Sequence, residues 1–429
     1  MNIKGLIKKF IPKFLLQAYH YSLAVLAKIT YRNPSEKLIV VGITGTAGKS
    51  SAAYFTAQIL EKAGLKVGMT TTTLFKIGEK EWLNSKKMTM LGRFQTQKLL
   101  KRMARAKCDV AIIETSSQGI EQFRHVGINY DIAVLTNLYP EHIEAHGGFA
   151  NYKQAKGKLF AHLPTLKHKN IKALKQIKKT IIVNGDDENV KYFLQFKSDQ
   201  KIVFTTNKNL RVTDYGLRLP AGEAGITNVI NDAGLKINLL GDYNVYNVLA
   251  AIAVAKALDI KTDNDLTYLK PLPGRLEFIK NNLGIKILVD YVFEPKAMEK
   301  LYNIVDRIEH KKIIHVLGAA GGGRDKAKRP ILGKMANKKA DVVVITNEDP
   351  YDEDPQKIID QVAEPVTKNK LYKILDRREA IRKALKLAEK DDLILVTGKG
   401  AEQAICVANE KKIPWDDRQV IKEELEKLN

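Results

Sequence analysis

The chain has 429 residues, which favours two or three domains, and its 45% hydrophobic and 28% charged residues are typical of an ordinary globular protein. Its net charge of +23 allows a nucleic acid, an anionic membrane or a phosphorylated substrate as a partner, although lysines spread along the whole chain also fit a solvated surface. Cys108 and Cys406 are far apart in the sequence, so they predict neither a disulfide framework nor a cysteine metal site, and they favour a cytoplasmic location.

Residues 1–36 form a basic and apolar leader that ends at the breaker run NPS (33–35). One glutamine, one histidine and one lysine interrupt its apolar stretch at 14–30, so we do not expect this stretch to span a membrane. Lysines precede the stretch. The pattern fits either an amphipathic helix on an anionic membrane or a helix packed against the protein's own body.

Strand-like and helix-like runs alternate from residue 37 to about residue 272. Continuous apolar, β-rich runs predict buried parallel strands, and helical patterns stand between them. The predicted strands are 38–44, 109–115 and 131–137, and the predicted helices are 50–62, 151–163 and 243–258. This alternation predicts a parallel α/β sheet, with Gly64 capping the first of these helices.

The run PLPG (271–274) is the clearest linker, and the alternation restarts after it. The predicted strands of this second part are 285–291, 311–318, 341–347 and 392–398, with helices from 295, from 326, at 355–362 and at 377–389. We therefore predict three parts. They are a helical leader at 1–36, a central P-loop-type ATPase domain with a parallel sheet at 37–272, and a Rossmann-like α/β domain at 273–429.

The run GTAGKS (45–50) follows a buried strand and opens a helix, which is the setting of a phosphate-binding loop. Glycines let the backbone approach phosphate oxygens, and the N–H groups at the helix start attract the anion. We expect Lys49 to reach the β- and γ-phosphates and the hydroxyl of Ser50 to bind Mg²⁺. Ile43 stands where the strict GxxxxGK[ST] spacing has its first glycine. The predicted nucleotide-binding residues of the loop are Gly45, Thr46, Gly48, Lys49, Ser50 and Ser51.

Glu114 ends a predicted buried strand in the run IIETSSQG (112–119). A carboxylate at the carboxyl edge of a strand beside a phosphate loop is well placed to hold Mg²⁺. The alternative is a glutamate that caps a helix or forms a salt bridge.

Several runs resemble motifs of the Mur ligase family, which also includes folylpolyglutamate synthases. VGITGTAGKSS (41–51) resembles the TGTxGK[ST] loop of that family. TNLYPEHIEAHGG (136–148) and NYKQAKGKLF (151–160) resemble its TNLxxDHLDxHG and YxxAKxxLF motifs. The resemblance covers residues 37–410 and is strongest to the MurE-type branch, which adds the third residue of the muramyl peptide.

The resemblance implies an ATP-dependent amide ligase that forms ADP and uses ATP with two Mg²⁺ ions. It implies catalytic roles for Lys49, Glu114, His142, Lys156 and Arg275. Glu114 and His142 would bind metal, and Lys156 would be carbamylated, which makes it an anionic group that helps to hold Mg²⁺. Two divalent ions would neutralise the γ-phosphate and the attacking carboxylate, which otherwise repel each other. A Lys156 ammonium would instead bind phosphate directly.

The run ETSSQGIEQFRHVG (114–127) carries Ser116, Gln122 and Arg124 at positions that bind the acceptor in the family. The planar fork of Arg124 suits a carboxylate or a phosphate, and a surface salt bridge is the alternative. Thr89 in KMTMLG (87–92) matches part of a TTP substrate motif.

The run LLGDYNVYNVLAA (239–251) resembles the family motif GxFNxxNxxAA. The resemblance implies that Asn244 and Asn247 face the nucleotide base, with helix N-capping as the alternative.

Three motifs follow the linker. GRLE (274–277) matches the interdomain motif GRxE, which implies that Arg275 contacts the γ-phosphate. VDYVFEPKAM (289–298) resembles VDYAHTPxAL and retains Asp290, an implied nucleotide contact, but it has Phe293 in place of the usual histidine. VLGAAGGGRDKAKRP (316–330) resembles GxGGxRDxxKRP, in which Arg324 faces an anionic substrate group.

The run TNEDPYDEDP (346–355) aligns with TxDNPRxExP, the motif that selects the incoming amino acid. Tyr351 replaces the arginine that reads the carboxylate of diaminopimelate, and Glu348 and Asp349 make the region acidic. GKGAE (398–402) resembles GKGHE, in which Glu402 would hold the amino group of the substrate. We therefore expect an amino acid that carries an extra amine, such as lysine.

Enzymes of the MurE-type branch bind the UDP group of their substrate with a larger N-terminal domain, whereas here only the basic leader precedes the phosphate loop. We expect a muramyl-peptide-type acceptor and an amino acid as substrates, in peptidoglycan precursor synthesis. The carrier of the acceptor is left open. A lipid-carried acceptor and peripheral contact of residues 1–36 with the inner face of the membrane fit the leader.

Three other functions are open. A folylpolyglutamate-synthase-like or polyglutamate-forming ligase shares the family. A P-loop NTPase that acts on nucleic acid would explain the positive net charge. No RNA-binding motif or aromatic-basic stripe supports this alternative, so no nucleic-acid partner is expected. A non-catalytic homologue is the third alternative, because Phe293, Tyr351 and Ala401 depart from the family motifs.

Overall fold

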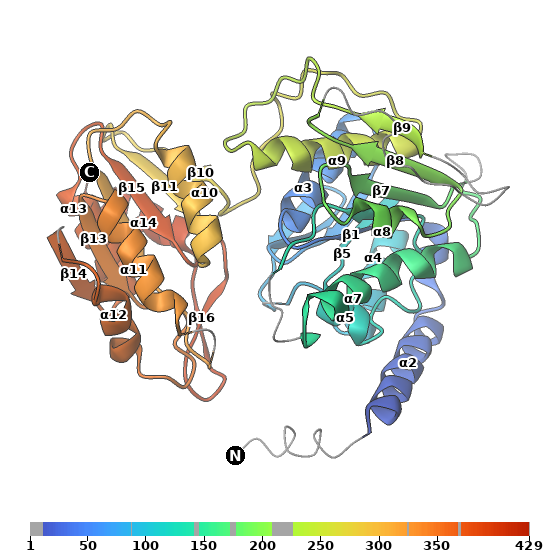
Figure 1. Ribbon diagram of the computed structural model, residues 1–429, viewed down its shortest axis with the longest axis horizontal. Helices are drawn as coiled ribbons and strands as arrows, with labels where there is room; N and C mark the ends of the chain where they lie inside the picture. The colour runs from blue at the N-terminus through green and yellow to red at the C-terminus, as the bar shows by residue number, and fades with distance from the viewer. Residues whose placement is uncertain are drawn as a thin grey trace. The chain divides into compact units, whose positions relative to one another are not determined.

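The computed structural model describes residues 12–86, 88–140, 146–171, 177–207, 226–323, 326–367 and 370–428. The chain forms two compact units (Figure 1). The first contains residues 1–82 and 88–270, and the second contains residues 83–87 and 271–429.

Within the described residues, the first unit is built on a nine-stranded sheet in the order β4-β3-β2-β5-β1-β6-β7-β8-β9. Its strands are β1 (Ile39–Thr44), β2 (Val67–Thr70), β3 (Leu74–Ile77), β4 (Lys80–Leu83), β5 (Val110–Glu114), β6 (Ile132–Leu135), β7 (Thr180–Asn184), β8 (Gln200–Phe204) and β9 (Ile226–Ile230). The run from β2 to β9 is parallel, and β3 pairs antiparallel with β2. The predicted parallel α/β sheet is confirmed.

Helices cover both faces of this sheet. The helices of this unit are α2 (Lys13–Thr30), η1 (Pro34–Lys37), α3 (Lys49–Lys62), α4 (Arg93–Arg105), α5 (Ser117–Glu121), α7 (Phe149–His162), η2 (Leu163–Thr165), α8 (Val190–Leu194) and α9 (Tyr243–Ala257). One face packs α4, α7 and α8 against the strands in a buried apolar cluster. On the other face α3 and α9 lie side by side (Figure 1), so the start of α3 is held by a helix from much later in the chain.

The second unit has a six-stranded sheet among its described residues, in the order β10-β11-β15-β12-β13-β14. The strands are β10 (Glu277–Phe278), β11 (Lys286–Asp290), β12 (Ile313–Leu317), β13 (Val342–Thr346), β14 (Lys370–Ile374) and β15 (Leu393–Thr397), with a hairpin of β16 (Ala404–Cys406) and β17 (Lys412–Pro414). The helices are α10 (Pro295–Val305), α11 (Lys328–Lys339), α12 (Pro355–Ala363), α13 (Arg377–Leu387) and α14 (Asp417–Glu426). All pairings from β11 to β14 are parallel, as expected of a Rossmann-like unit.

The helical leader is present as α2, which packs on α4, and the short turn η1 that follows it also packs on α4. Its outer side exposes large apolar side chains, namely Phe14, Leu15, Tyr19, Tyr21, Leu26 and Ile29. Among the helices of the described residues, none combines the length and the apolar character needed to cross a bilayer.

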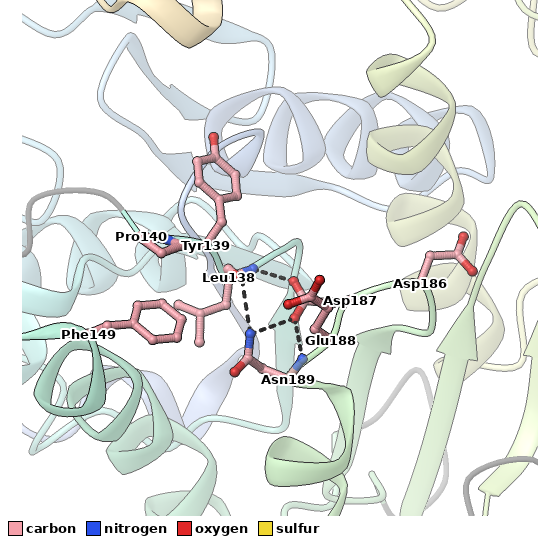
Figure 2. Close-up of a pocket in the computed structure, with 8 residues that line it drawn as sticks. All are labelled: Leu138, Tyr139, Pro140, Phe149, Asp186, Asp187, Glu188 and Asn189. Carbon is pink, nitrogen blue, oxygen red and sulfur yellow. Dashed lines mark hydrogen bonds between the residues drawn. The ribbon is translucent and has the colours of Figure 1, made fainter.

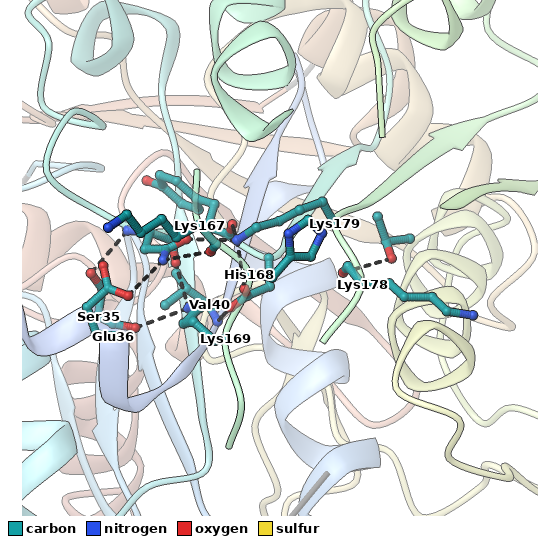
Figure 3. Close-up of polar contacts among 12 residues, drawn as sticks. Ser35, Glu36, Val40, Lys167, His168, Lys169, Lys178 and Lys179 are labelled. Carbon is teal, nitrogen blue, oxygen red and sulfur yellow. Dashed lines mark hydrogen bonds and ion pairs between the residues drawn. The ribbon is translucent and has the colours of Figure 1, made fainter. Parts of the chain in front are cut away.

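A buried ionic cluster ties together the amino ends of the central strands (Figure 3). Asp131, immediately before β6, is fully buried and pairs with the ammonium groups of Lys169 and Lys179. Both lysines are labelled in Figure 3. Lys169 Nζ also donates to three backbone carbonyl oxygens at 2.7–3.1 Å, and the N–H of Val40 in β1 donates to Asp131 Oδ2 at 2.8 Å. One carboxylate therefore pairs with two buried ammonium groups and also holds β1 and β6 in register.

We predict that Asp131→Asn destabilises the first unit by about 3 kcal/mol or more, because removing one partner of a buried ion pair leaves uncompensated buried charge. The chain has two tryptophans, Trp82 in the first unit and Trp415 in the second. In a Trp415→Phe background, urea unfolding followed by the fluorescence of Trp82 reports on the first unit alone. Asp265→Asn makes the same chemical change at an exposed turn of that unit and serves as the control. Equal midpoints for the two variants would contradict the prediction.

Candidate active site

The phosphate loop joins β1 to α3 and depends on two glycines. Gly45 and Gly48 have φ angles of 153° and 79°, which L side chains rarely adopt. A Cβ atom would lie 2.0 Å from Thr136 Oγ1 at Gly45 and 2.3 Å from Asn247 Oδ1 at Gly48. The loop is therefore packed too closely for any other residue at either position.

The segment after β6 fixes the loop from the neighbouring strand. Asn137 Oδ1 accepts a hydrogen bond from the N–H of Ala47 at 2.9 Å, and Asn137 Nδ2 donates to the carbonyl of Ala47 at 3.1 Å. The hydroxyl of Thr136 donates to the same carbonyl at 2.7 Å. Sequence reasoning did not select Thr136 or Asn137. Their place at the start of the TNLYPEH run was the signal that could have found them.

Glu114 lies at the carboxyl end of β5, beside the end of β1, and is 2% exposed. Its Oε2 accepts hydrogen bonds from the Ser50 hydroxyl and from the N–H of Thr72, each at 2.7 Å. Thr72 Oγ1 lies 3.0 Å from Glu114 Oε1 and 3.0 Å from the hydroxyl of Thr89. The structure thus brings Ser50, Glu114 and Thr89 together, and it adds Thr72, which sequence reasoning missed.

The pairing of a hydroxyl with one carboxylate fits Mg²⁺, which is commonly bound by one or two carboxylates together with substrate phosphates and water. Across the described ranges, no group of three histidine, cysteine or acidic side chains is arranged to hold a metal ion. An ion held by Ser50 and Glu114 would also be bound by phosphate oxygens and water.

Two lysine side chains donate hydrogen bonds to the phosphate loop. Lys49 Nζ donates to the carbonyl of Thr46 at 2.7 Å, and Lys156 Nζ donates to the carbonyl of Gly45 at 2.7 Å. Lys156 comes from α7, is 1% exposed, and lies 4.5 Å from the centre of the Tyr152 ring. Lys49 and Lys156 therefore converge on the loop that Glu114 also reaches through Ser50. Two other predicted site residues, His142 and Arg324, lie outside the described residues.

The predicted acceptor-binding residues form a second group. The Ser116 hydroxyl accepts from the N–H of Gly119 at 3.2 Å and so caps α5. Gln122 Oε1 accepts from Arg124 Nε at 3.0 Å and from Arg124 Nη2 at 2.6 Å. Among the described side chains no carboxylate pairs with Arg124. The alternative interpretation of Arg124 as part of a surface salt bridge is therefore not supported by these residues.

Asn244 and Asn247 lie on α9 beside the phosphate loop and are both buried. Asn247 Nδ2 donates to Asn244 Oδ1 at 3.0 Å, and Asn244 Nδ2 donates to the carbonyl of Leu240 at 2.7 Å. The residue in the N-cap position is Asp242. Asn247 therefore packs closely against Gly48 of the loop and is bonded to Asn244, while the N-cap position belongs to Asp242.

A pocket adjoins the loop and is shown in Figure 2. It is lined by Leu138, Tyr139, Pro140, Phe149, Asp186, Asp187, Glu188 and Asn189. Asp187 accepts a hydrogen bond from the N–H of Leu138, and Asn189 Nδ2 donates to the carbonyl of Leu138 at 3.2 Å. The N–H of Tyr139 donates to the hydroxyl of Thr46 at 3.2 Å, so this wall of the pocket also orients the phosphate loop.

The second unit contains its own polar cluster at the carboxyl ends of β13 and β15. Lys399 Nζ is fully buried and pairs with Asp349 Oδ1 at 2.9 Å and with Glu402 Oε2 at 2.5 Å. The hydroxyl of Tyr291 donates to Glu402 Oε1 at 2.8 Å. Sequence reasoning identified Asp349 and Glu402 but not Lys399, although it lies in the GKGAE run.

Glu348 lies in the same part of the second unit and is 4% exposed. Its Oε2 has no hydrogen-bond partner in the described part of the chain. Burial raises the pKa of Glu348 to about 7, against the opposing effect of Lys399. A buried carboxyl with an unused oxygen is suited to bind a donor group.

Arg275 lies over the ring of Tyr291 at 4.4 Å and donates to the carbonyl of Tyr291 at 3.3 Å. Asp290 accepts from the N–H of Leu276 at 2.6 Å, and its burial raises its pKa to about 6 against the effect of Arg275. Tyr351 has a φ of 52°, and its N–H donates to the carbonyl of Cys406 at 3.1 Å.

Comparison with known proteins places these features in a family. The model of the Mur ligase middle domain matches residues 43–255, and the model of the Mur ligase, glutamate ligase domain matches residues 274–400. The UDP-N-acetylmuramyl-tripeptide synthetase of Roseiflexus sp. (strain RS-1) is 34% identical over 427 residues, which cover 95% of this chain and 82% of that protein. The chain belongs to the Mur ligase family. The resemblance inferred from the sequence is confirmed.

A further relative and two solved structures are also similar to this chain. The UDP-N-acetylmuramoyl-L-alanyl-D-glutamate–2,6-diaminopimelate ligase of Clostridium tetani is 33% identical, over 95% of this chain and 81% of that protein. A solved structure of a ligase with the same name covers 91% of this chain and 79% of its own at 24% identity, with a TM-score of 0.57. The folylpolyglutamate synthase of Mycobacterium tuberculosis has a TM-score of 0.62 at 16% identity, covering 92% of this chain and 94% of its own. At these identities the structures show a shared fold.

We predict a pH-dependent stability contribution from Glu348. Because its pKa is about 7 in the folded protein and 4.5 ordinarily, the folded state keeps a proton that the unfolded chain releases between these values. The contribution is fully present below the ordinary value and is lost as pH rises through the folded value. Glu348→Gln should therefore gain stability relative to the original protein between about pH 5 and about pH 8.

The measurement is urea unfolding followed by the fluorescence of Trp415 in a Trp82→Phe background, which reports on the second unit. Glu299→Gln removes one charge at an exposed position of α10 and controls for net charge. A difference between the original protein and Glu348→Gln that stays constant over this pH range would contradict the prediction.

Proposed function

We propose that this Mur ligase family member joins an amino acid to a carboxylate of a muramyl-peptide acceptor through an acyl-phosphate, with ATP as the phosphoryl donor. The observation that carries the proposal is the convergence of Lys49, Lys156 and the bonded pair Ser50–Glu114 on one phosphate loop. The Roseiflexus relative is named a UDP-N-acetylmuramyl-tripeptide synthetase and the Clostridium tetani relative a diaminopimelate ligase of a muramoyl peptide, which supports a place in peptidoglycan precursor synthesis.

The chain's own residues supply the parts that phosphoryl transfer needs. The loop N–H groups and Lys49 hold the phosphates, and the Ser50–Glu114 pair faces the same position. Mg²⁺ bound by that pair would neutralise charge on the γ-phosphate and on the attacking carboxylate. Arg275 is proposed as a further γ-phosphate contact. The neutral amine of the amino acid then attacks the acyl-phosphate, which forms the amide and releases phosphate.

We further propose that Lys156 is carbamylated and that two Mg²⁺ ions act, with His142 as a metal ligand. The burial of Lys156 and its 2.7 Å contact with the loop support this, because a carbamate on Nζ would place an anion among the phosphates and metal ions. An unmodified ammonium at the same place would bind phosphate directly.

The incoming substrate is proposed to be a diamino acid such as lysine. Asp349 and Glu402 pair with the buried Lys399, and the buried Glu348 is close enough to be influenced by the charge of Lys399, so three carboxyl groups lie in this part of the unit. The unused oxygen of Glu348 is suited to accept a hydrogen bond from an amine. Tyr351 stands where an arginine would read the second carboxylate of diaminopimelate, which disfavours that substrate.

The test combines MgATP, each candidate amino acid, and a muramyl-dipeptide acceptor with or without UDP, with products detected by mass spectrometry. We expect an amide product with lysine and release of ADP, and loss of product in Lys49→Met and Lys156→Met. Exposed Lys270→Met is the control. Glutamate addition to a folate would favour the folylpolyglutamate alternative, and DNA-stimulated ATP hydrolysis without any amide product would favour a nucleic-acid NTPase.

We also propose that this enzyme works in the cytoplasm and touches the inner face of the membrane through α2. The helix exposes 67% of Phe14 and 64% of Ile29, and its sequence contains no acidic residue. Apolar side chains on a helix without negative charge suit an anionic lipid surface.

Liposome flotation tests this contact. We expect the full chain to float with vesicles that contain phosphatidylglycerol and to float less with vesicles of phosphatidylcholine alone. The variant Phe14→Gln/Ile29→Gln and a chain without residues 1–36 should both lose binding, while exposed Leu375→Gln in the second unit should not. Equal flotation of all four proteins would rule the contact out.

A further inference from the structure

We infer that Arg93, at the start of α4, joins Arg124 in one binding site for a second anionic group of the acceptor. Arg124 is expected at the acceptor from its motif, whereas Arg93 has no assigned role. The inference deepens the proposed function and rests on it, because it names a chemical feature that the acceptor must have.

The two guanidinium groups are held together by Gln122. Arg93 Nη2 donates to the backbone carbonyl of Gln122, and Arg124 donates through Nε and Nη2 to its side-chain Oε1 at 3.0 and 2.6 Å. Arg124 Nη1 donates to the backbone carbonyl of Met90. All of these acceptors are neutral, so the structure fixes two cations in place without compensating their charge.

The charge of the pair is unbalanced. Within the described ranges, no carboxylate lies at ion-pair distance from Arg93 or Arg124, and the buried Arg93 Nε has no hydrogen-bond acceptor. Burial and the charge of Arg124 lower the pKa of Arg93, and burial lowers the pKa of Arg124. Two half-buried cations without a counter-ion repel each other. A bound anion would relieve that repulsion and use the free N–H groups of the planar forks.

The pair lies next to the reaction centre. Arg124 contacts Met88 and Met90, at 3.1 Å to the sulfur of Met88, and these two residues flank Thr89. The hydroxyl of Thr89 is 3.0 Å from that of Thr72, which contacts Glu114. If the reacting carboxylate of the acceptor lies near Glu114, a second anionic group a few covalent bonds away in the same acceptor would reach the arginine pair. The acceptor in the name of the Clostridium tetani relative ends in D-glutamate, which has a second carboxylate of the kind that this pair could bind.

Arg93 also has a structural contact, since it supports the carbonyl of Gln122, and the test must separate this from its charge. The variant Arg93→Gln can keep a donor to that carbonyl and loses the charge, while Arg93→Lys keeps the charge. Arg105→Gln removes an exposed arginine from the other end of α4 and is the matched control.

The substrates are UDP-N-acetylmuramoyl-L-alanyl-D-glutamate and the same acceptor with its free α-carboxylate amidated. We expect Arg93→Gln to raise KM for the dicarboxylic acceptor about tenfold or more, because a charge-assisted hydrogen bond is lost. KM for ATP should stay unchanged, and the amidated acceptor should give the same KM with both proteins. Arg93→Lys should recover part of the loss. Equal effects of Arg93→Gln on both acceptors would overturn the inference.

Calorimetric binding of the two acceptors without ATP or amino acid separates this inference from the proposed function. Tighter binding of the dicarboxylic acceptor to the original protein than to Arg93→Gln supports the site even if no amide product ever forms. Equal binding overturns it even if ligation proceeds. Inorganic phosphate is the competing probe. If phosphate displaces the amidated and the dicarboxylic acceptor equally well, the site takes phosphate and the assignment to a carboxylate is wrong.

Discussion

The hydrogen bond between the Ser50 hydroxyl and Glu114 couples the phosphate loop to the neighbouring strand. It forms because β1 and β5 are parallel and in register, with Ile43 opposite Glu114, so that both strands end at the same level. Thr72 after β2 and Asn137 after β6 reach the same edge from either side. The sheet order β2-β5-β1-β6 is thus the constraint that gathers residues from four segments around one loop.

At the amino ends of these strands, a buried ion cluster helps to hold neighbouring strands together. Asp131 pairs with Lys169 and Lys179 at the amino ends of the strands and accepts a hydrogen bond from β1. At the carboxyl ends of the strands, Lys49 and Lys156 donate to backbone carbonyls of the phosphate loop. The amino ends therefore carry a structural ion cluster, and the carboxyl ends carry the candidate site.

Much of this arrangement could be predicted from local patterns. Buried strands such as β1 and β5 are continuous apolar runs, and α3 begins and ends at the glycines that the sequence marks, Gly48 and Gly64. By contrast, β14 is half exposed and the hairpin β16–β17 is short, so neither carries a clear pattern. Thr72, Lys399 and the contact of Arg93 with Gln122 were missed because they depend on which strands and loops become neighbours in space.

The close approach of Gly48 to Asn247 has a consequence for synthesis of the chain on the ribosome. The loop and α3 emerge early, but the helix that packs against them, α9, is translated only after β7, β8 and β9. A nascent chain that has just completed β1 and α3 lacks this support, so the nucleotide-binding surface is finished late in translation. Until then the side of α3 that faces α9 stays uncovered, although β1, β2 and β5 can already cover its other side.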